Sequence, residues 1–215
     1  MRISFDKLHT NRKMFLSENK LKDNVYLLGS SPVLISAPHG VSQVRLGKLK
    51  APEIGSIATA LFLKNNTNSH LVAKTKNNND DANFDEECRY KNRIKEIIKT
   101  NEIKFVLDLH GLAAHRGVDI NLGTHLGVNI VSNKRAYVAL VKLLEENGFS
   151  VSVDQPFMAG ANTISSFVKK EFPDVWSIQI EINCSITNKK ENFDRYKKLL
   201  SALAEWCKFA ESEKF

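Results

Sequence analysis

Long apolar runs, cysteine pairs and an apolar leader are all missing from this sequence, and each absence excludes a class of protein. No run approaches the ~18 residues of a membrane-spanning helix. The opening residues contain no long apolar segment followed by small residues, so we expect no secretory signal. The cysteines Cys88, Cys184 and Cys207 lie far apart and form no CxxC pair. This spacing indicates a reducing, cytoplasmic setting rather than a disulfide framework.

The excess of positive charge is not gathered into one binding face. The net charge is +7, but the lysines are scattered and the basic clusters are mixed with asparagine or acidic residues. No recognisable nucleic-acid-binding module is present, so we expect neither nucleic acid nor a membrane as a partner. The overall basicity can still concentrate small anionic ligands near the surface.

Strand and helix patterns alternate along the chain, which is typical of one α/β domain around a mixed sheet. With 215 residues and 42% apolar content, a single domain can bury a full core. Residues 1–20 show no clean period, and we expect an irregular N-terminal arm there. Apolar patterns predict strands at residues 25–28, 33–36, 70–75, 105–111, 118–122, 128–131, 149–153 and 176–182, and helices at residues 52–62, 90–100, 137–147, 163–170 and 196–207.

Polar residues follow or interrupt three of these strands near their carboxyl ends. His39 comes directly after Pro38, which cannot donate to a strand ladder and should end the strand before it. Asp108 and His110 lie at the end of the strand over residues 105–111, and Glu181 interrupts the strand over residues 176–182. Ligands of open α/β sheets bind at the carboxyl ends of the strands, so the sequence predicts a site there.

The residue types at these strand ends are those of a hydrolytic zinc site. Two histidines and an oxygen ligand, with one position left for water, suit zinc best among common ions. Glu181 would be the general base, since burial raises the pKa of a carboxyl group. Each residue also has a structural interpretation. His39 could bond a loop carbonyl, Glu181 could belong to a core ion pair, and Asp108 could hold a loop amide or orient a histidine.

Three motifs, at residues 36–40 (SAPHG), 106–111 (VLDLHG) and 178–183 (IQIEIN), resemble the N-formylglutamate amidohydrolase family. That family is related in fold to zinc carboxypeptidases and to succinylglutamate desuccinylase or aspartoacylase. The resemblance implies a three-layer α/β/α fold with a mixed central sheet and a single zinc ion. It also implies cleavage of an amide bond next to a glutamate-type carboxylate, or of poly-γ-glutamate.

Position by position, the resemblance makes His39 and His110 the metal histidines and Glu181 the catalytic carboxylate. The sequence departs from the pattern at the third ligand. The carboxypeptidase pattern has Glu three residues after the first histidine, where this chain has Ser42. The nearest acidic residue is Glu53, just inside a predicted helix. Glu53 could reach the metal, or it could complement the dipole of that helix.

A carboxylate-bearing substrate would need a cationic partner, and the planar guanidinium of arginine serves this best. Arg89 and Arg93 share a predicted helix face, and Arg116 follows His110, although each could also be a solvated surface residue. Asn83 and Asn162 could add neutral hydrogen bonds.

The sequence therefore predicts a zinc-dependent amidohydrolase that acts on a small N-acyl amino acid or γ-glutamyl amide, with one Zn²⁺ per chain. The bond that it cleaves would be a C–N bond other than an α-peptide bond. The alternative, suggested by Ser42, is a catalytically inactive family member that acts as a binding module with a retained metal site.

Overall fold

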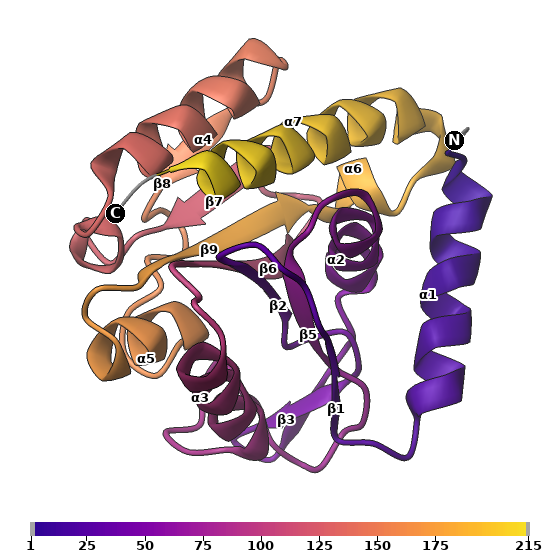
Figure 1. Ribbon diagram of the computed structural model, residues 1–215. Coiled ribbons are helices and arrows are strands. Elements are labelled where there is room, and N and C mark those ends of the chain that lie inside the picture. The colour runs from indigo at the N-terminus through magenta and orange to yellow at the C-terminus, as the bar shows by residue number, and fades with distance from the viewer. Residues whose placement is uncertain (1–2, 214–215) are drawn as a thin grey trace.

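The computed structural model describes residues 3–213, which fold around a seven-stranded sheet of order β1-β5-β2-β6-β9-β7-β8 (Figure 1). A separate two-stranded hairpin, β3-β4, lies outside this sheet. The strands are β1 Asn24–Leu27, β2 Val33–Ala37, β3 Gln43–Arg45, β4 Lys48–Lys50, β5 His70–Lys74, β6 Phe105–Leu112, β7 Ile120–Gly123, β8 Val151–Val153 and β9 Trp176–Asn183.

The sheet is mixed, as predicted. Strands β5, β2, β6 and β9 run parallel to one another, whereas β1 is antiparallel to β5 and β7 is antiparallel to β9. The central strands β2 and β9 are buried along their whole length. Near-continuous burial of this kind requires cover on both faces of the sheet.

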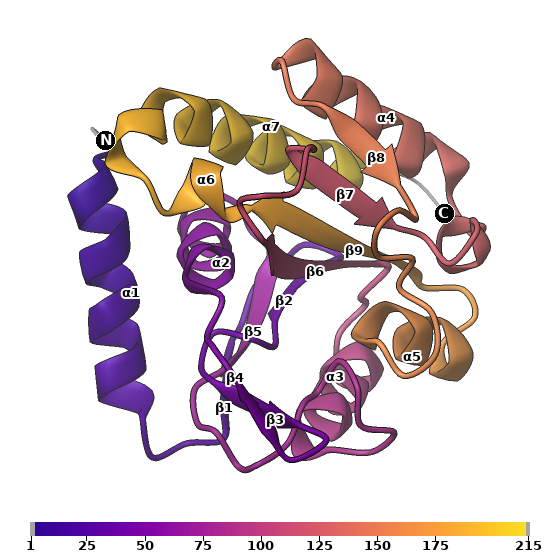
Figure 2. The same cartoon turned by 180° about the vertical axis from the view of Figure 1, so that it is seen from behind.

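Helices supply that cover and make three layers (Figures 1 and 2). The larger apolar cluster joins one sheet face to α2, α4 and α7, with α1 packed outside α2. The smaller cluster joins the opposite face to α3 and α5. The three-layer α/β/α fold is thereby confirmed. The helices are α1 Phe5–Asn19, α2 Ile54–Asn66, α3 Arg89–Thr100, α4 Lys134–Glu146, α5 Ile164–Glu171, α6 Cys184–Thr187 and α7 Phe193–Ser212, with short 3₁₀ turns at Val128–Ile130 and Lys190–Asn192.

Side chains alternate between the two faces of the sheet along β6 and β9, and the residues on the two faces differ in polarity. Leu107, Leu109, Ile178 and Ile180 enter the larger apolar cluster. Because side chains alternate along a strand, Asp108, His110, Gln179 and Glu181 lie on the opposite face, which α3 and α5 cover. One face of these two strands is thus apolar, whereas the other carries the buried polar side chains.

The prediction of an irregular N-terminal arm is wrong for the part of it that the structure describes. Residues 5–19 form the helix α1, which Ser4 caps by accepting a hydrogen bond from the backbone N–H of Lys7 at 3.2 Å. Leu8 is the buried residue of this helix. A helix with so narrow a buried face shows no clear apolar period in the sequence. Residues 1 and 2 of the predicted arm lie outside the described residues.

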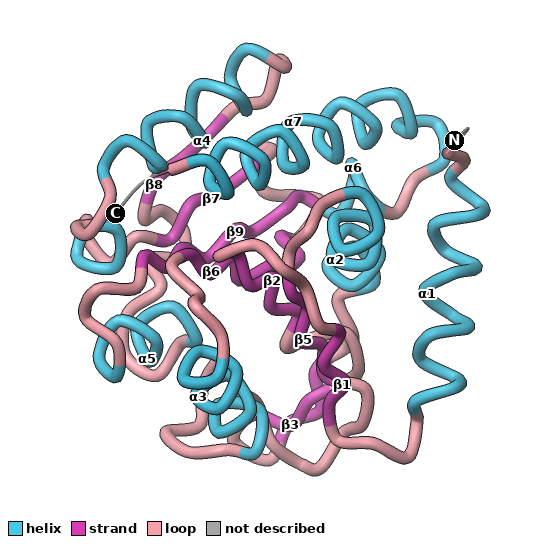
Figure 3. Tube along the Cα trace, viewed as in Figure 1, coloured by secondary structure: helices cyan, strands magenta, loops and turns pink. Residues whose placement is uncertain are grey.

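Two other local predictions are corrected. The predicted strand over residues 128–131 is a 3₁₀ turn, and Val128 and Val131 are more than half exposed, so their β-branched side chains are not packed in a sheet. Residues 41–50, for which the sequence predicts neither a strand nor a helix, contain the hairpin β3-β4 (Figure 3). In the described part of the chain no helix has the length and apolar character needed to cross a membrane.

Candidate metal centre

The candidate centre is assembled by the ends of β2 and β6 and the start of α2. Strand β2 ends at Ala37, one residue before Pro38, which leaves His39 in the loop beyond the strand. His110 lies in β6, the parallel neighbour of β2. Glu53 is the N-cap residue of α2, and its backbone N–H donates to the carbonyl of His39 at 2.9 Å. This bond holds the start of the helix against the loop.

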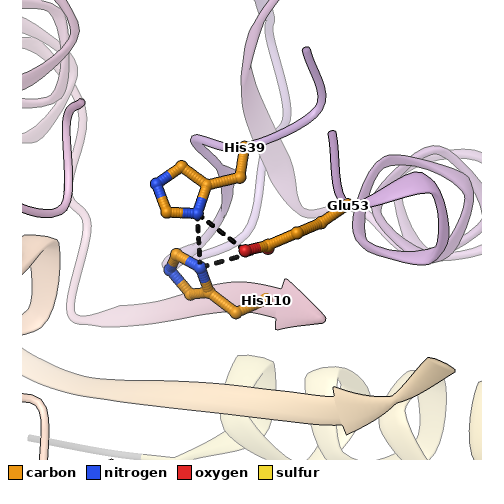
Figure 4. Close-up of side chains that lie close together, drawn as sticks. All are labelled: His39, Glu53 and His110. Carbon is orange, nitrogen blue, oxygen red and sulfur yellow. Dashed lines mark hydrogen bonds and ion pairs between the residues drawn. The ribbon is translucent and has the colours of Figure 1, made fainter. Parts of the chain in front are cut away.

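Figure 4 shows the three side chains pointing toward one another. The Nδ1 atoms of His39 and His110 lie 3.2 Å apart. Glu53 reaches His39 Nδ1 with Oε1 at 2.8 Å and His110 Nδ1 with Oε2 at 3.3 Å. Ligand atoms bound to one tetrahedral ion at about 2.0–2.1 Å would lie roughly 3.3 Å apart. The three side chains could therefore hold a metal ion.

Two outer carboxylates direct the imidazole rings toward this point. His39 Nε2 donates to Asp81 Oδ1 at 2.9 Å, and His110 Nε2 donates to Asp108 Oδ2 at 3.0 Å. Because an ionised carboxylate only accepts, each bond places a proton on Nε2 and leaves the Nδ1 lone pair for a metal. Asp108 also accepts a hydrogen bond from Ser36 Oγ at 2.8 Å. Of the two roles that the sequence suggested for Asp108, the structure agrees with the orientation of a histidine.

The charges of the centre also suit a cation. Burial opposes a charge on either imidazole, but the surrounding carboxylates outweigh it and raise the pKa of His39 and of His110. Burial likewise acts to raise the pKa of Glu53, yet the two imidazoles hold it well below its usual value. Without metal, the cluster therefore retains protons where a cation would sit, and metal binding would release them.

Glu181 lies beside this cluster, because β9 pairs with β6 in a register that sets it opposite His110. It is 6% exposed. Burial, opposed by His110 and reinforced by the charge of Glu53, raises the pKa of Glu181 to about 7. A carboxyl group with such a pKa can accept and return a proton near neutrality.

A cavity of about 560 Å³ opens onto the candidate metal ligands and Glu181. Arg45, Lys50 and Arg116 give its wall positive charge, and Arg116 lies 5.5 Å above the ring of Phe157. Further lining residues come from the loop beyond β8, namely Asp154, Gln155, Pro156, Phe157, Met158 and Ala159. The volume is within the range of small-molecule sites.

The structure brings only some of the predicted substrate residues to this cavity. Arg116 and Asn83 line it, whereas Arg89, Arg93 and Asn162 do not. Arg93 instead pairs with Glu96 at 2.8 Å and covers the ring of Tyr26 on the edge strand β1. The i, i+4 spacing correctly predicts that Arg89 and Arg93 lie in one helix. It does not determine whether their face of α3 is directed toward the cavity.

Sequence reasoning missed Asp81 and Gln179. Asp81 lies in an aperiodic loop crowded with Asn and Asp, so nothing distinguishes it from its neighbours. Gln179 had a usable signal, because it precedes Glu181 by two positions in a strand and so shares its face. Ser42, the residue found where a third ligand was expected, accepts from Asn77 Nδ2 at 3.3 Å and is not part of the cluster.

The comparisons with solved structures establish the fold. A gene product of Agrobacterium tumefaciens matches with a TM-score of 0.64 at 15% identity, over 93% of this chain and 97% of its own. N-formylglutamate amidohydrolase from Ralstonia eutropha matches with a TM-score of 0.59 at 15% sequence identity, over 88% of this chain and 97% of its own. A bacteriophage poly-gamma-glutamate hydrolase matches with 0.53 at 14%, over 88% of each chain.

No protein-family model matches the sequence, and no curated protein does so either. The chain therefore has the fold of a group of hydrolases that includes an N-formylglutamate amidohydrolase, in agreement with the resemblance of its three motifs. At this identity the likeness concerns the fold alone.

Proposed function

We propose that this protein is a zinc-dependent amidohydrolase that cleaves an amide bond of a small carboxylate-bearing substrate, such as an N-acyl amino acid or a γ-glutamyl amide. The observation that supports this most is the convergence of three donor atoms, from His39, Glu53 and His110, beside the buried Glu181. All four residues line one cavity. The N-formylglutamate amidohydrolase and the poly-gamma-glutamate hydrolase with this fold act on substrates of this kind, as their names state.

In this proposal the side chains divide the work. A zinc ion held by His39, Glu53 and His110 would polarise the substrate carbonyl and lower the pKa of a water molecule. Glu181 takes a proton from water and gives it to the departing nitrogen, which its pKa of about 7 permits in both directions. Asp81 and Asp108 keep both imidazoles turned with Nδ1 toward the centre.

We propose Arg116 as the partner of the substrate carboxylate. It lies in the cavity wall, it is an exposed residue, and its stacking on Phe157 limits the conformations it adopts. Arg45 is less available, because its Nε already donates to Asp81 at 2.7 Å. Glu53 supplies the carboxylate that Ser42 lacks, which favours an active hydrolase over a binding module. The cysteines are free, which fits the reducing, cytoplasmic setting that we propose.

Metal content and turnover test the proposal together. We expect one zinc per chain in the purified protein, a loss of that zinc in His110→Ala, and no loss in His115→Ala, an exposed loop histidine. We also expect release of formate or free amino acid from a panel of N-acyl amino acids and γ-glutamyl amides. Glu181→Gln should retain the zinc and keep only a small residual turnover.

Zinc far below one per chain, unchanged by His110→Ala, would contradict the metal site. Full zinc without turnover of any compound in the panel would instead favour the binding module.

A further inference from the structure

A chain of three hydrogen bonds runs from the start of α5 to Glu181. The backbone N–H of Ile164 donates to Asn83 Oδ1 at 2.8 Å. Asn83 Nδ2 donates to Gln179 Oε1 at 3.0 Å, and Gln179 Nε2 donates to Glu181 Oε1 at 2.8 Å. These bonds connect a loop, a helix and the central strand β9 at the wall of the cavity.

The direction of this chain is determined at its first member. A backbone N–H can only donate, so the atom of Asn83 that faces Ile164 must be the oxygen. The nitrogen of Asn83 then faces Gln179 and can only donate, which requires the oxygen of Gln179 there. The remaining nitrogen of Gln179 faces Glu181. The orientation of both amides therefore follows from one peptide group, and no second arrangement satisfies all three contacts.

Gln179 is well suited to transmit this orientation. It is 2% exposed and lies two residues before Glu181 on the same face of β9. Its amide nitrogen donates a hydrogen bond to Oε1 of Glu181, and no described residue forms a hydrogen bond with the other oxygen, Oε2. The two oxygens of the carboxylate are thereby made different, one held and one free.

We infer that Gln179 is a positioning residue that fixes Glu181 through Oε1 and leaves Oε2 to carry the proton, with Asn83 setting the orientation of Gln179. This inference rests on the proposed function, in which Glu181 is the general base. It also changes the role of Asn83. That residue was expected to contact the substrate, but here its oxygen and one of its amide hydrogens are already used within the protein.

Two substitutions separate orientation from simple packing. Gln179→Met keeps the volume and removes the donor to Glu181. Asn83→Asp keeps the bond from Ile164 but faces Gln179 with an oxygen, so the amide of Gln179 must turn and present its own oxygen to Glu181. We expect both to lower kcat by about 10- to 100-fold, because a misplaced catalytic group can cost that much. KM should stay within about twofold, and zinc content should equal that of the unaltered protein.

The control is Asn92→Asp, an exposed position on α3 away from the cavity, which should leave kcat unchanged. In a double-mutant cycle, Gln179→Met should have no further effect on the residual turnover of Glu181→Gln, because the residue through which it acts has been altered. An unchanged kcat in Gln179→Met, or a raised KM with kcat retained, would overturn the inference. The second result would make Gln179 a substrate contact.

A spectroscopic measurement tests the orientation apart from catalysis. The side-chain amide resonance of Gln179, assigned by its loss in Gln179→Met, should shift in Asn83→Asp and in Glu181→Gln but not in Asn92→Asp. If the resonance behaves so in a protein without turnover, the proposed function fails and the orientation stands. If turnover is present and the resonance ignores Asn83→Asp, the orientation fails and the proposed function stands.

Discussion

His39 and Asp81 are 42 positions apart in the sequence, and Nε2 of His39 donates to Oδ1 of Asp81 over 2.9 Å. The other oxygen of Asp81 accepts from Arg45 Nε at 2.7 Å, so the carboxylate is held between a histidine and an arginine. The Asp81 side chain is fully buried. The orientation of a candidate metal ligand therefore depends on a loop residue that no local sequence pattern marks.

Substitution of this loop carboxylate should weaken metal binding without removing a ligand. Asp81→Asn keeps the shape of the side chain but removes its negative charge and allows the ring of His39 to turn. We expect a 10- to 100-fold loss of zinc affinity, measured by competition with a chromophoric chelator. Asp108→Asn should act likewise through His110. Asp194→Asn, at an exposed position on α7, is the control, and an equal loss there would show that the effect is only one of net charge.

Zinc should stabilise the folded protein. A ligand that binds only the folded state adds about 2.7 kcal/mol at 100 times its Kd, which for a domain of this size raises Tm by roughly 5–10 °C. We expect this rise on adding zinc to chelator-treated protein, and its reversal by EDTA. His39→Ala and Glu53→Gln should show little or no rise in scanning calorimetry. A full rise in both would locate the bound zinc elsewhere.

Glu181 should make the metal-free protein less stable as the pH rises. Its pKa is about 7 in the folded state and near 4.5 when unfolded, so between these values the folded state holds the proton more tightly. Stability contributed by this proton is present below about pH 4.5 and is lost as the pH rises through 7. Glu181→Gln removes this pH-dependent loss of stability. At pH 8 the free energy of unfolding of the variant should therefore exceed that of the unaltered protein by at most about 3 kcal/mol.

Urea denaturation of both chelator-treated proteins at pH 5 and pH 8 measures this gain. The difference in unfolding free energy between variant and unaltered protein should be larger at pH 8. If the difference is the same at both pH values, Glu181 is already ionised in the metal-free protein at pH 5.

A side chain at Gly55 should destabilise the folded protein. A Cβ at this position would lie 2.2 Å from Oγ1 and 2.5 Å from Cβ of Thr187, at the contact between α2 and α6. Alanine normally stabilises a helix interior relative to glycine by about 1 kcal/mol. Here overpacking should reverse the sign, so that Gly55→Ala loses about 1–3 kcal/mol in chemical denaturation. Gly117→Ala adds the same methyl group in a loop, where nothing lies within 4 Å of the added Cβ, and should be close to neutral.

The sequence was informative where a buried strand determines both neighbours and direction. His39, Asp108, His110 and Glu181 could be placed together, because parallel strands bring their carboxyl ends to one edge and β2, β6 and β9 proved to be such strands. Glu53 was found as one of two interpretations, and the structure gives it the place of the third donor while it also begins α2.

Prediction was poor where a contact joins distant segments or where burial is slight. The strands β1 and β2 are consecutive in the chain, yet β5 lies between them in the sheet. Helix α1 buries too little to show a period. Asp81 acquires its role only when the loop after β5 folds back over the end of β2. Such long-range placement depends on tertiary packing, which local patterns do not encode.

The turn at Asp81–Asp85 contains two residues that bind different side chains of the site. Asp81 holds His39, and two positions later Asn83 holds Gln179, while the backbone N–H of Asn83 donates to Asp81 Oδ1 at 3.0 Å. Under the proposed function, metal retention and proton transfer thus depend on one short peptide segment. We therefore expect substitutions in this turn to change zinc affinity and turnover together, so that altering these residues could not tune one property independently of the other.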